Sequence, residues 1–300
     1  NFPADFIAEG VDQTRGWFYT LHALGTLLYD SVAYRNVIAN GLVLDKNGNK
    51  MSKRLGNVVD PFDMLNGEGA DATRWYMVHN AQLWDDLKFD PDGVAETKRK
   101  FFGTLFNVYG FFAMYANIDG FQYQEAEIPL ERRPELDRWI ISLLNTLVKN
   151  VEELMDNYEP TWATRKIQDF VVDNLSNWYV RLSRRRFWKG EYTEEKIAAY
   201  QTIYYCLETI AHLIAPFAPF YAERLFQDLN SVSGRIHQES VHLSYYPAYQ
   251  AEWVDKPLEG RMGMAQEITT QALSLRKRED VRVRQPLNRI ILATADDTAL

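Results

Sequence analysis

Two kinds of hydrophobic spacing divide this chain. Up to about residue 96 the pattern is that of strand, turn, helix, strand and loop, whereas residues 97–250 repeat apolar positions at helical spacing. We therefore expect an α/β region over residues 1–96 and an all-α region over residues 97–250. Residues 251–300 are expected to form a short α+β segment. These three ranges are the predicted domains.

The first region predicts one strand–helix–strand unit. Residues 5–8 are a short extended run and residues 36–45 a second one. Asp12 is a good N-cap for the helix between them, whose apolar stripe begins at Trp17 and continues through Leu21, Leu24 and Leu28. A mononucleotide-binding fold of the Rossmann type has about five strands. The unit is therefore only part of such a fold.

Polar residues follow the first strand at the point where the helix begins. They are Glu9, Gly10, Asp12 and Gln13. Ligands of open parallel sheets bind at the carboxyl ends of the strands, and carboxylates there can accept hydrogen bonds from sugar hydroxyls. Helix capping alone explains these residues equally well. Periodicity by itself favours a core position for Trp17.

A basic loop follows the second strand. Its sequence is Lys50-Met51-Ser52-Lys53-Arg54. Gly48 and Gly56 bracket the loop and give it backbone freedom, so we expect it to move. Two lysines three residues apart can converge on a triphosphate, where they are most useful if negative charge grows during a reaction. For an arbitrary Lys-x-x-Lys-Arg sequence, however, a solvated surface loop is the commoner interpretation.

The all-α region predicts a bundle of four to five helices with short connections. Another helix is expected over residues 71–80, one more over residues 257–279, and a strand over residues 289–294. Breaks are expected at residues 119–120, 159–160 and 189–190 and at the prolines 216 and 219. The long helices are predicted at residues 94–117, 134–158, 162–188 and 194–226.

One stretch of that region interleaves arginines with aromatic residues, from Trp178 to Lys189. On a helix, four of these side chains share a face: Arg181, Arg184, Arg185 and Trp188. Guanidinium groups pair with phosphates, and both guanidinium groups and aromatic rings stack on unpaired bases, so this face is a candidate RNA contact. A structural face that pairs with Asp169 and Asp173 is an equally good interpretation.

Composition limits the classes of function. The 300 residues are 46% hydrophobic and 25% charged, as in ordinary globular proteins, and the net charge of −8 argues against indiscriminate nucleic-acid binding. Cys206 is the one cysteine, which excludes a disulfide framework or a Cys-x-x-Cys zinc site within this chain and favours a cytoplasmic location. No apolar run reaches the ~20 residues of a membrane span, and no metal site is expected. The chain opens on Asn1 without a leader, as though cut from something longer.

Two motifs carry a resemblance to a known family. The string Lys50-Met-Ser-Lys53-Arg54-Leu-Gly56-Asn57 resembles the mobile KMSKS loop of class I aminoacyl-tRNA synthetases, with Arg54 in the last place. The segment Glu9-Gly-Val-Asp12-Gln13-Thr-Arg15-Gly16-Trp17-Phe18 resembles isoleucyl-tRNA synthetases, whereas the valyl and leucyl relatives carry different residues there. Residues 136–140, 174–180 and 213–220 are similar to recurring phrases of the family's anticodon-binding domain.

The resemblance implies activation of isoleucine by ATP, with Mg²⁺ on the phosphates, and transfer to tRNA(Ile). Lys50 and Lys53 would be catalytic and would hold the ATP phosphates together with Met51 and Ser52. The site for the aminoacyl adenylate would contain Glu9, Gly10, Asp12, Gln13 and Trp17. Within it, the two carboxylates would hold the ribose, the Gln13 amide the ammonium group, and Trp17 one wall of the isoleucine pocket.

The family's His-Ile-Gly-His type tetrapeptide and its editing domain are both missing from this sequence. The chain therefore resembles the C-terminal part of the catalytic domain, with a connecting segment, followed by the anticodon-binding domain. We expect it to bind tRNA but to be catalytically incomplete without the N-terminal half. A non-catalytic tRNA-binding module and a valyl or leucyl relative are the alternatives.

Overall fold

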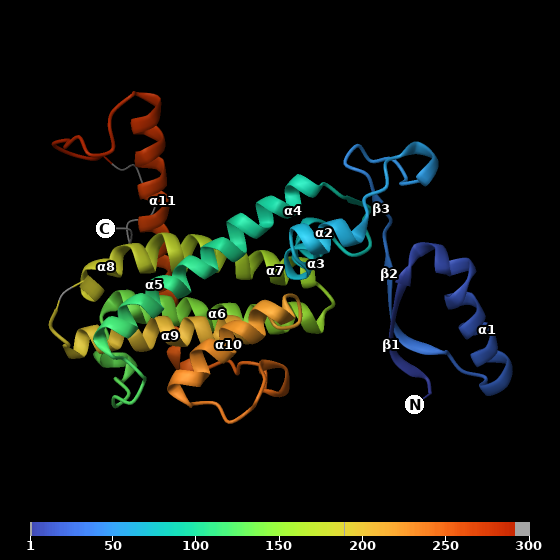
Figure 1. Cartoon of the computed structure of the whole chain (residues 1–300), viewed down its shortest axis with the longest axis horizontal. Helices are drawn as coiled ribbons and strands as arrows, with labels where there is room; N and C mark the ends of the chain where they lie inside the picture. Colours follow the sequence, from blue (N-terminus) through green and yellow to red (C-terminus); the bar gives the residue numbers. More distant parts are fainter. Residues whose placement is uncertain (1, 189, 292–300) are drawn as a thin grey trace.

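The computed structural model describes residues 2–188 and 190–291. It consists of a long helical body with a small α/β unit at one end, which is the fold class expected from the sequence (Figure 1). Lys189 and the last residues of the strand predicted at 289–294 lie outside the described residues. Residues 281–291 contain no strand.

The α/β unit is one parallel crossover. Strands β1 (Ala4–Gly10) and β2 (Tyr34–Asn40) pair in parallel, and helix α1 (Trp17–Tyr29) connects them, as the sequence predicts. The second predicted strand is interrupted, because Leu42 N–H turns aside to donate to Asp86 Oδ1 at 2.7 Å. Strand β3 (Val43–Leu44) then pairs in parallel with β4 (Leu87–Lys88) in a separate sheet.

Asp12 is not the N-cap of α1, so that prediction is wrong. A 3₁₀ turn, Val11–Arg15, separates β1 from the helix, and Gly16 is the residue before its first turn. Trp17 N–H at the start of α1 donates to Gln13 Oε1 at 2.9 Å. The side chain of Gln13 is long enough to reach the helix end across this extra turn, whereas Asp12 precedes it by too much.

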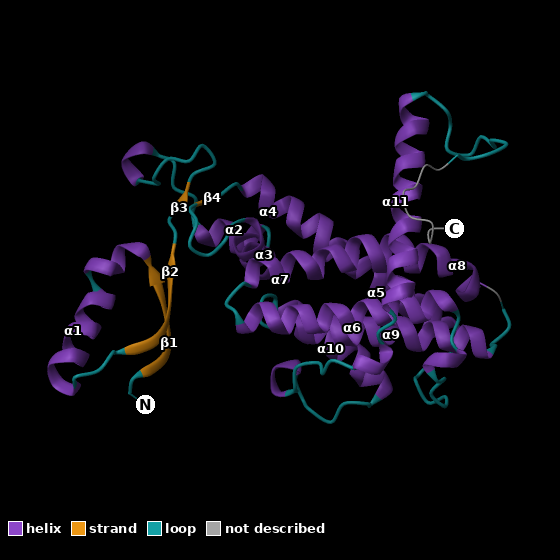
Figure 2. Cartoon of the chain, turned by 180° about the vertical axis from the view of Figure 1, so that it is seen from behind, coloured by secondary structure: helices purple, strands orange, loops and turns teal. Residues whose placement is uncertain are grey.

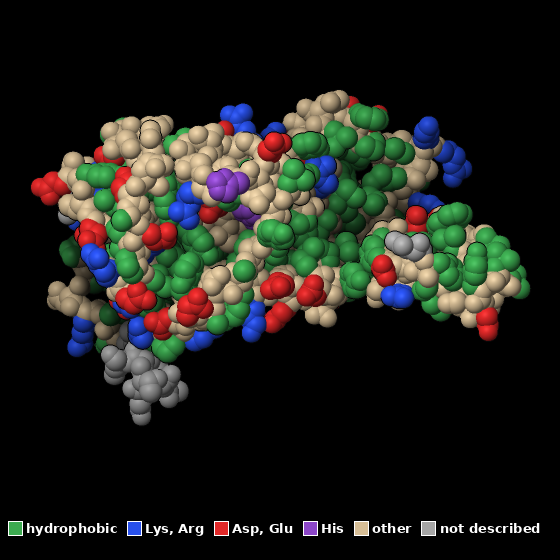
Figure 3. Space-filling view, turned by 90° about the horizontal axis from the view of Figure 1, so that it is seen from below, with side chains coloured by type: hydrophobic (Ala, Val, Ile, Leu, Met, Phe, Trp, Pro, Cys, Tyr) green, Lys and Arg blue, Asp and Glu red, His purple; other side chains and the backbone are tan. Residues whose placement is uncertain are grey.

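The apolar stripe of α1 is exposed rather than buried. Trp17 is 51% exposed, Leu24 and Leu28 are also exposed, and only Phe18 and Gly25 of this helix are buried. The core position that periodicity favours for Trp17 is therefore wrong in this structure. Figure 3 shows hydrophobic side chains spread over the end of the molecule that carries the α/β unit.

The rest of the described chain is mainly helical, and several helices run into one another through π-helical turns. Lys98–Phe102 is such a turn between α4 and α5, and Phe170–Val180 joins α7 to α8. The break predicted at the two prolines separates α9 from α10. The helices are α2 (Pro61–Gly67), α3 (Ala70–Asn80), α4 (Pro91–Thr97), α5 (Gly103–Asp119), α6 (Glu135–Asp156), α7 (Pro160–Asp169), α8 (Arg181–Trp188), α9 (Glu194–Ile214), α10 (Pro219–Ser233) and α11 (Lys256–Arg278).

One continuous core runs through the helical body, from Ala72 to Leu258. Helix α9 lies in its centre, and most of its residues are buried. Helix α3 already belongs to this core through Trp75 and Tyr76, and Thr161 Oγ1 on α7 donates to the carbonyl of Val78 at its far end at 2.8 Å. Helix α11 packs on α6 near its start and then extends away from the body (Figure 1). The boundary at residue 97 stays a prediction.

Candidate functional site

The predicted adenylate residues lie together at one edge of the β1–β2 sheet. Because the strands are parallel, Glu9 stands opposite Ala39 and Gly10 opposite Asn40, and both strands end at this edge (Figure 2). Asp12 Oδ2 accepts a hydrogen bond from Gln13 Nε2 at 3.0 Å, and the carboxylate is otherwise exposed. The arrangement leaves acceptor oxygens and the open face of Trp17 at a strand end, where small ligands bind.

The basic loop begins only a few residues beyond that edge. Residues 41–44 lead from β2 through β3 to Asp45, and the loop follows. Lys50 forms an isolated bridge with Leu44, so the loop folds back on the strand that precedes it. Lys50 and Lys53 are both exposed to solvent. The structure thus brings the two lysines onto one short loop, with their side chains free to meet an anion.

Local contacts explain the shape of this loop. Ser52 begins a 3₁₀ turn, Lys53–Leu55, and its Oγ accepts from Leu55 N–H at 3.3 Å. Met51 packs against the core of the helical body, which anchors the middle of the loop. Gly48 and Gly56 have φ of 85° and 64°, in the left-handed region that favours glycine. Motion of the loop stays a prediction.

Asp45 and Asn57 hold the base of the loop together, and the sequence reasoning missed both. Asp45 Oδ2 accepts from Asn57 Nδ2 at 2.9 Å, and Asn57 Oδ1 accepts from Ser52 N–H at 2.9 Å. The hydrogen bond from Asn57, with those from the Asn49 and Asn47 backbone, lowers the pKa of Asp45 below its usual value. Asx residues at both ends of a glycine-bracketed loop were the available signal.

The strand-end residues and the loop lysines remain separate groups in this structure. Within residues 2–188 and 190–291, no hydrogen bond or ion pair joins Lys50 or Lys53 to Glu9, Asp12 or Gln13. The first group ends the β1–β2 sheet and the second follows the β3–β4 sheet. A ligand long enough to touch both groups, such as a nucleotide, would have to bridge the two sheets.

The candidate RNA face lies on α8. Arg181, Arg184 and Arg185 are exposed, and Trp188 is 58% exposed. None of the three arginines has an ion-pair partner among the described residues, so the alternative pairing with Asp169 and Asp173 is not made. The face is available to an external anion.

Arg186 lies on the same helix but points into the body, where it has a structural role. It forms two hydrogen bonds with Asp137, at 2.5 and 2.7 Å, and Tyr179 donates to the same carboxylate at 2.9 Å. Asp137 and Tyr179 are fully buried. Burial, and then the Asp137 charge, raise the pKa of Tyr179 well above its ordinary value. This cluster ties α6, α8 and the π-helical turn together.

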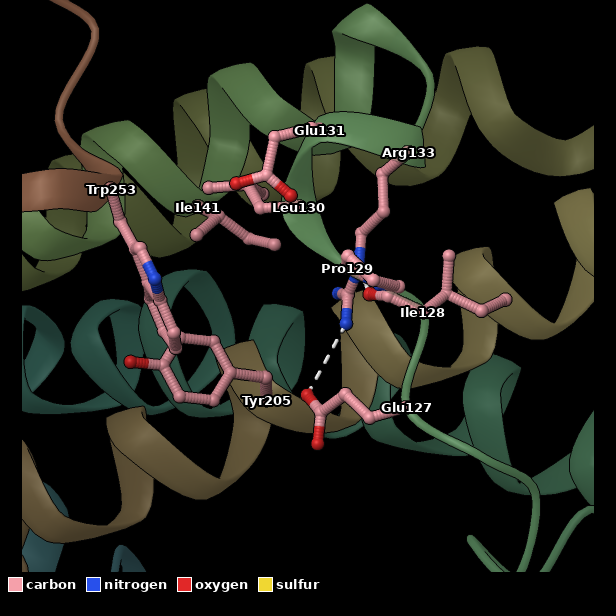
Figure 4. Close-up of a pocket in the computed structure, with 9 residues that line it drawn as sticks. All are labelled: Glu127, Ile128, Pro129, Leu130, Glu131, Arg133, Ile141, Tyr205 and Trp253. Carbon is pink, nitrogen blue, oxygen red and sulfur yellow. Dashed lines mark hydrogen bonds and ion pairs between the residues drawn. The ribbon is translucent and has the colours of Figure 1, made fainter.

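A hollow of about 290 Å³ opens at the surface of the helical body, between the segment at residues 127–133, α6, α9 and Trp253 (Figure 4). Arg133 in its wall is already held by four hydrogen bonds, to the carbonyl of Ile128, Thr202 Oγ1, Gln201 and Glu127. The Tyr205 and Trp253 rings meet edge to face. We assign this hollow no chemistry.

The described part of the chain contains neither a cluster of metal-binding side chains nor a membrane-spanning helix. It contains no group of three or more His, Cys, Asp or Glu side chains suited to holding a metal ion. None of its helices combines the length and the apolar character needed to cross a bilayer.

Family models match both halves of the chain. The model "tRNA synthetases class I (I, L, M and V)" covers residues 1–90, and "Anticodon-binding domain of tRNA ligase" covers residues 137–291. The strand-end residues and the loop fall within the first match. The candidate RNA face falls within the second.

Curated relatives named isoleucine–tRNA ligase match almost the whole chain. The protein of Bacteroides thetaiotaomicron is 60% identical over 99% of the chain, and that of Cytophaga hutchinsonii is 62% identical over 97%. The Thermus thermophilus protein is 46% identical over 98%. The chain spans only 26–28% of the length of these three relatives. The resemblance to isoleucyl-tRNA synthetases is confirmed.

Solved structures support the fold. A methionyl-tRNA synthetase of Mycobacterium tuberculosis bound by methionyl-adenylate matches with a TM-score of 0.64 and 21% identity, covering 83% of this chain and 48% of its own. A leucyl-tRNA synthetase of Agrobacterium radiobacter in a ternary complex matches with a TM-score of 0.63 and 21% identity, covering 84% of this chain and 29% of its own. With both family models matching in chain order, the chain belongs to the class I tRNA synthetases.

Proposed function

We propose that this chain is part of an isoleucine–tRNA ligase, which activates isoleucine with ATP and transfers it to tRNA(Ile). The observation that carries the proposal is a loop with two exposed lysines, which follows strand β3 a few residues beyond the end of the parallel β1–β2 sheet that presents Glu9 and Asp12. The high identity to isoleucine–tRNA ligases supports the choice of amino acid. The chain alone is proposed to bind tRNA without forming the adenylate.

In this proposal Lys50 and Lys53 neutralise the ATP phosphates, and Met51 and Ser52 shape the loop that carries them. Lysine suits this role because its compact charge can follow a departing pyrophosphate. Glu9 and Asp12 accept from the ribose hydroxyls beside Gly10, and Trp17 offers an exposed ring to the isoleucine side chain. Gln13 reaches the ammonium group only if a ligand replaces its present bonds to Asp12 and Trp17 N–H.

The reaction needs little covalent help from the protein. The isoleucine carboxylate attacks the α-phosphorus of ATP, a carboxyl oxygen–phosphorus bond forms, and the bond to the leaving pyrophosphate breaks. Positioning and charge neutralisation lower the barrier. Mg²⁺ is proposed to enter with the phosphates, because this ion keeps several waters and is usually bound through substrate phosphates rather than in a dedicated protein cage.

We propose the helical body as the anticodon-binding domain, with Arg181, Arg184, Arg185 and Trp188 contacting tRNA. The support is their exposure and their lack of ion pairs with described residues. Residues 1–96, 97–250 and 251–300 remain the proposed domains. A cytoplasmic location is also proposed, because the one cysteine is a free buried thiol.

Two assays test the proposal side by side. Isoleucine-dependent ATP–pyrophosphate exchange is expected from the full-length protein that contains this chain and not from residues 1–300 alone. Filter binding with tRNA(Ile) is expected to show binding by both. Exchange that depends on valine or leucine instead would contradict the amino-acid assignment, and brisk exchange by the isolated chain would contradict the claim that it is incomplete.

A further inference from the structure

We infer that Asp45 and Asn57 are positioning residues that set the height and orientation of Lys50 and Lys53 over the nucleotide phosphates. This inference rests on the proposed function, because it concerns the same loop. The side chains of both residues are directed at the loop's own backbone and at each other. Their role would be to hold the loop in a shape from which both lysines can act together.

The geometry is that of a brace across the base of the loop. Asp45 stands before the lysines and Asn57 after them, and the two side chains meet at 2.9 Å. Asp45 is 8% exposed, although the loop around it is mostly open to solvent. Its Oδ1 accepts from the backbone N–H groups of Asn47 and Asn49, at 3.0 and 2.8 Å. The Asp45 carboxylate therefore accepts hydrogen bonds both from the start of the loop, at Asn47 and Asn49, and from its end, at Asn57.

Asn57 carries the brace to the lysines themselves. Its Nδ2 also donates to the carbonyl of Lys50 at 3.3 Å, and its Oδ1 accepts from the N–H of Ser52 at 2.9 Å. These two backbone groups lie on either side of Met51. The Asn57 side chain thus fixes the backbone at Lys50 and at the residue before Lys53. A shift of Asn57 would move both ammonium groups.

The hydrogen bonds are directional, so reversing the pair provides a sharp test. In Asp45→Asn an NH₂ group faces the NH₂ of Asn57, and in Asn57→Asp two carboxylates face each other. The double variant Asp45→Asn/Asn57→Asp restores one donor opposite one acceptor, and the carboxylate introduced at position 57 can still accept from Ser52 N–H. Two longer bonds are lost, the one to the Lys50 carbonyl at 3.3 Å and the one from Asn49 Nδ2 to Asp45 Oδ2 at 3.5 Å.

We expect each single variant of the full-length protein to raise the KM for ATP about tenfold in pyrophosphate exchange, with the KM for isoleucine unchanged. The double variant should return the KM for ATP to within about threefold of the original. A simple loss of folded protein would lower kcat without changing the KM for ATP, and the swap would not rescue it. Asp63→Asn is the matched control, since Asp63 is an exposed carboxylate in the first turn of α2.

The 300-residue chain gives a second measurement that needs no catalysis. Trypsin cleaves after Lys50, Lys53 and Arg54, and loss of the brace should raise the cleavage rate about tenfold in each single variant, because cleavage follows local opening. The double variant should restore protection. Equal cleavage in all variants, or an unchanged KM for ATP in both single variants, would overturn the inference. If the unaltered full-length protein shows no isoleucine-dependent exchange, the proposed function fails, while the cleavage series still tests the brace.

Discussion

The helical body and the α/β unit differ in how each buries its apolar residues. In the body, large side chains such as Trp139, Tyr179 and Leu207 are at most 1% exposed and belong to one core. In the α/β unit the stripe on α1 faces solvent, and Phe6, which is 47% exposed, stacks on Tyr158 of the body with ring centroids 5.3 Å apart. The residues proposed to carry the chemistry thus lie in the part of the chain that buries fewer of its apolar side chains, whereas the helical body buries most of its own.

The largest expected effect is on the stability of the body. Asp137→Ala removes the partner of Arg186 and leaves a mostly buried guanidinium without its carboxylate, which should lower the free energy of unfolding by about 3–5 kcal/mol. Chemical denaturation followed by circular dichroism measures this. Glu194→Ala breaks the exposed ion pair with Arg132 and should cost less than about 1 kcal/mol. If the two variants lost similar amounts of unfolding free energy, the claim that the buried ion pair stabilises the body more than the exposed one would be contradicted.

The next effect concerns the α/β side and should leave stability unchanged. Lys53→Ala in the full-length protein is expected to lower the kcat for pyrophosphate exchange by about 10²–10³-fold, because the lysine meets charge that develops on the leaving group. Lys46→Ala changes an exposed lysine of the same connection and should have little effect. Full activity of Lys53→Ala would break the assignment of the loop.

A smaller effect tests the external face of the body. Reversing two charges with Arg184→Glu/Arg185→Glu should weaken tRNA binding about 10- to 100-fold and should reduce the slope of log affinity against log salt by nearly one per lost phosphate contact. Filter binding over a range of salt concentrations measures both. The variant Arg184→Lys/Arg185→Lys keeps the charges and should keep most of the slope. An unchanged affinity and slope in the reversed variant would dispose of the contact.

The smallest effect uses a histidine at the junction of α3 and α7. Burial, with help from Arg165 and Lys100, lowers the pKa of His79 from 6.5 to about 4. The unfolded chain therefore takes up this proton at a higher pH than the folded chain, and stability falls as the pH drops below about 6.5. Between pH 7 and 5 the free energy of unfolding should fall by about 1–2 kcal/mol from this group. His79→Gln should remove that part of the slope, and identical slopes would contradict the assignment.

The helices of the body were predictable because their apolar spacing is set by the core that they surround. Helices were predicted at residues 134–158 and 194–226 from apolar positions at helical intervals. Helix α6 occupies nearly the first range, and α9 and α10 divide the second at the predicted proline break. The π-helical turns were not predictable, since they insert a residue without changing composition. The strand expected at 289–294 was inferred from local sequence alone, and residues 281–291 have no neighbouring strand with which to pair.

Site residues that belong to a recognisable motif could be predicted from the sequence. Polar residues that are buried in pairs could not. Lys50, Lys53, Glu9 and Asp12 follow from their motifs and from the resemblance. Asp137 could not be found in the same way, because aspartate is rarely fully buried unless it is paired, and its partner Arg186 is remote in sequence. The exposure of Trp17 could not be predicted from periodicity, because its spacing on the helix is that of a core residue.

Hydrogen exchange on the full-length protein tests most directly whether the strand-end residues around Glu9 and the loop with Lys50 and Lys53 form one nucleotide site. Peptides covering residues 9–17 and 50–57 would be followed by mass spectrometry with and without ATP and isoleucine. The account predicts that both segments gain protection together when both substrates are present, while peptides from α6 and α9 do not change. Protection of only one segment, or of neither in an enzyme that is active, would contradict it.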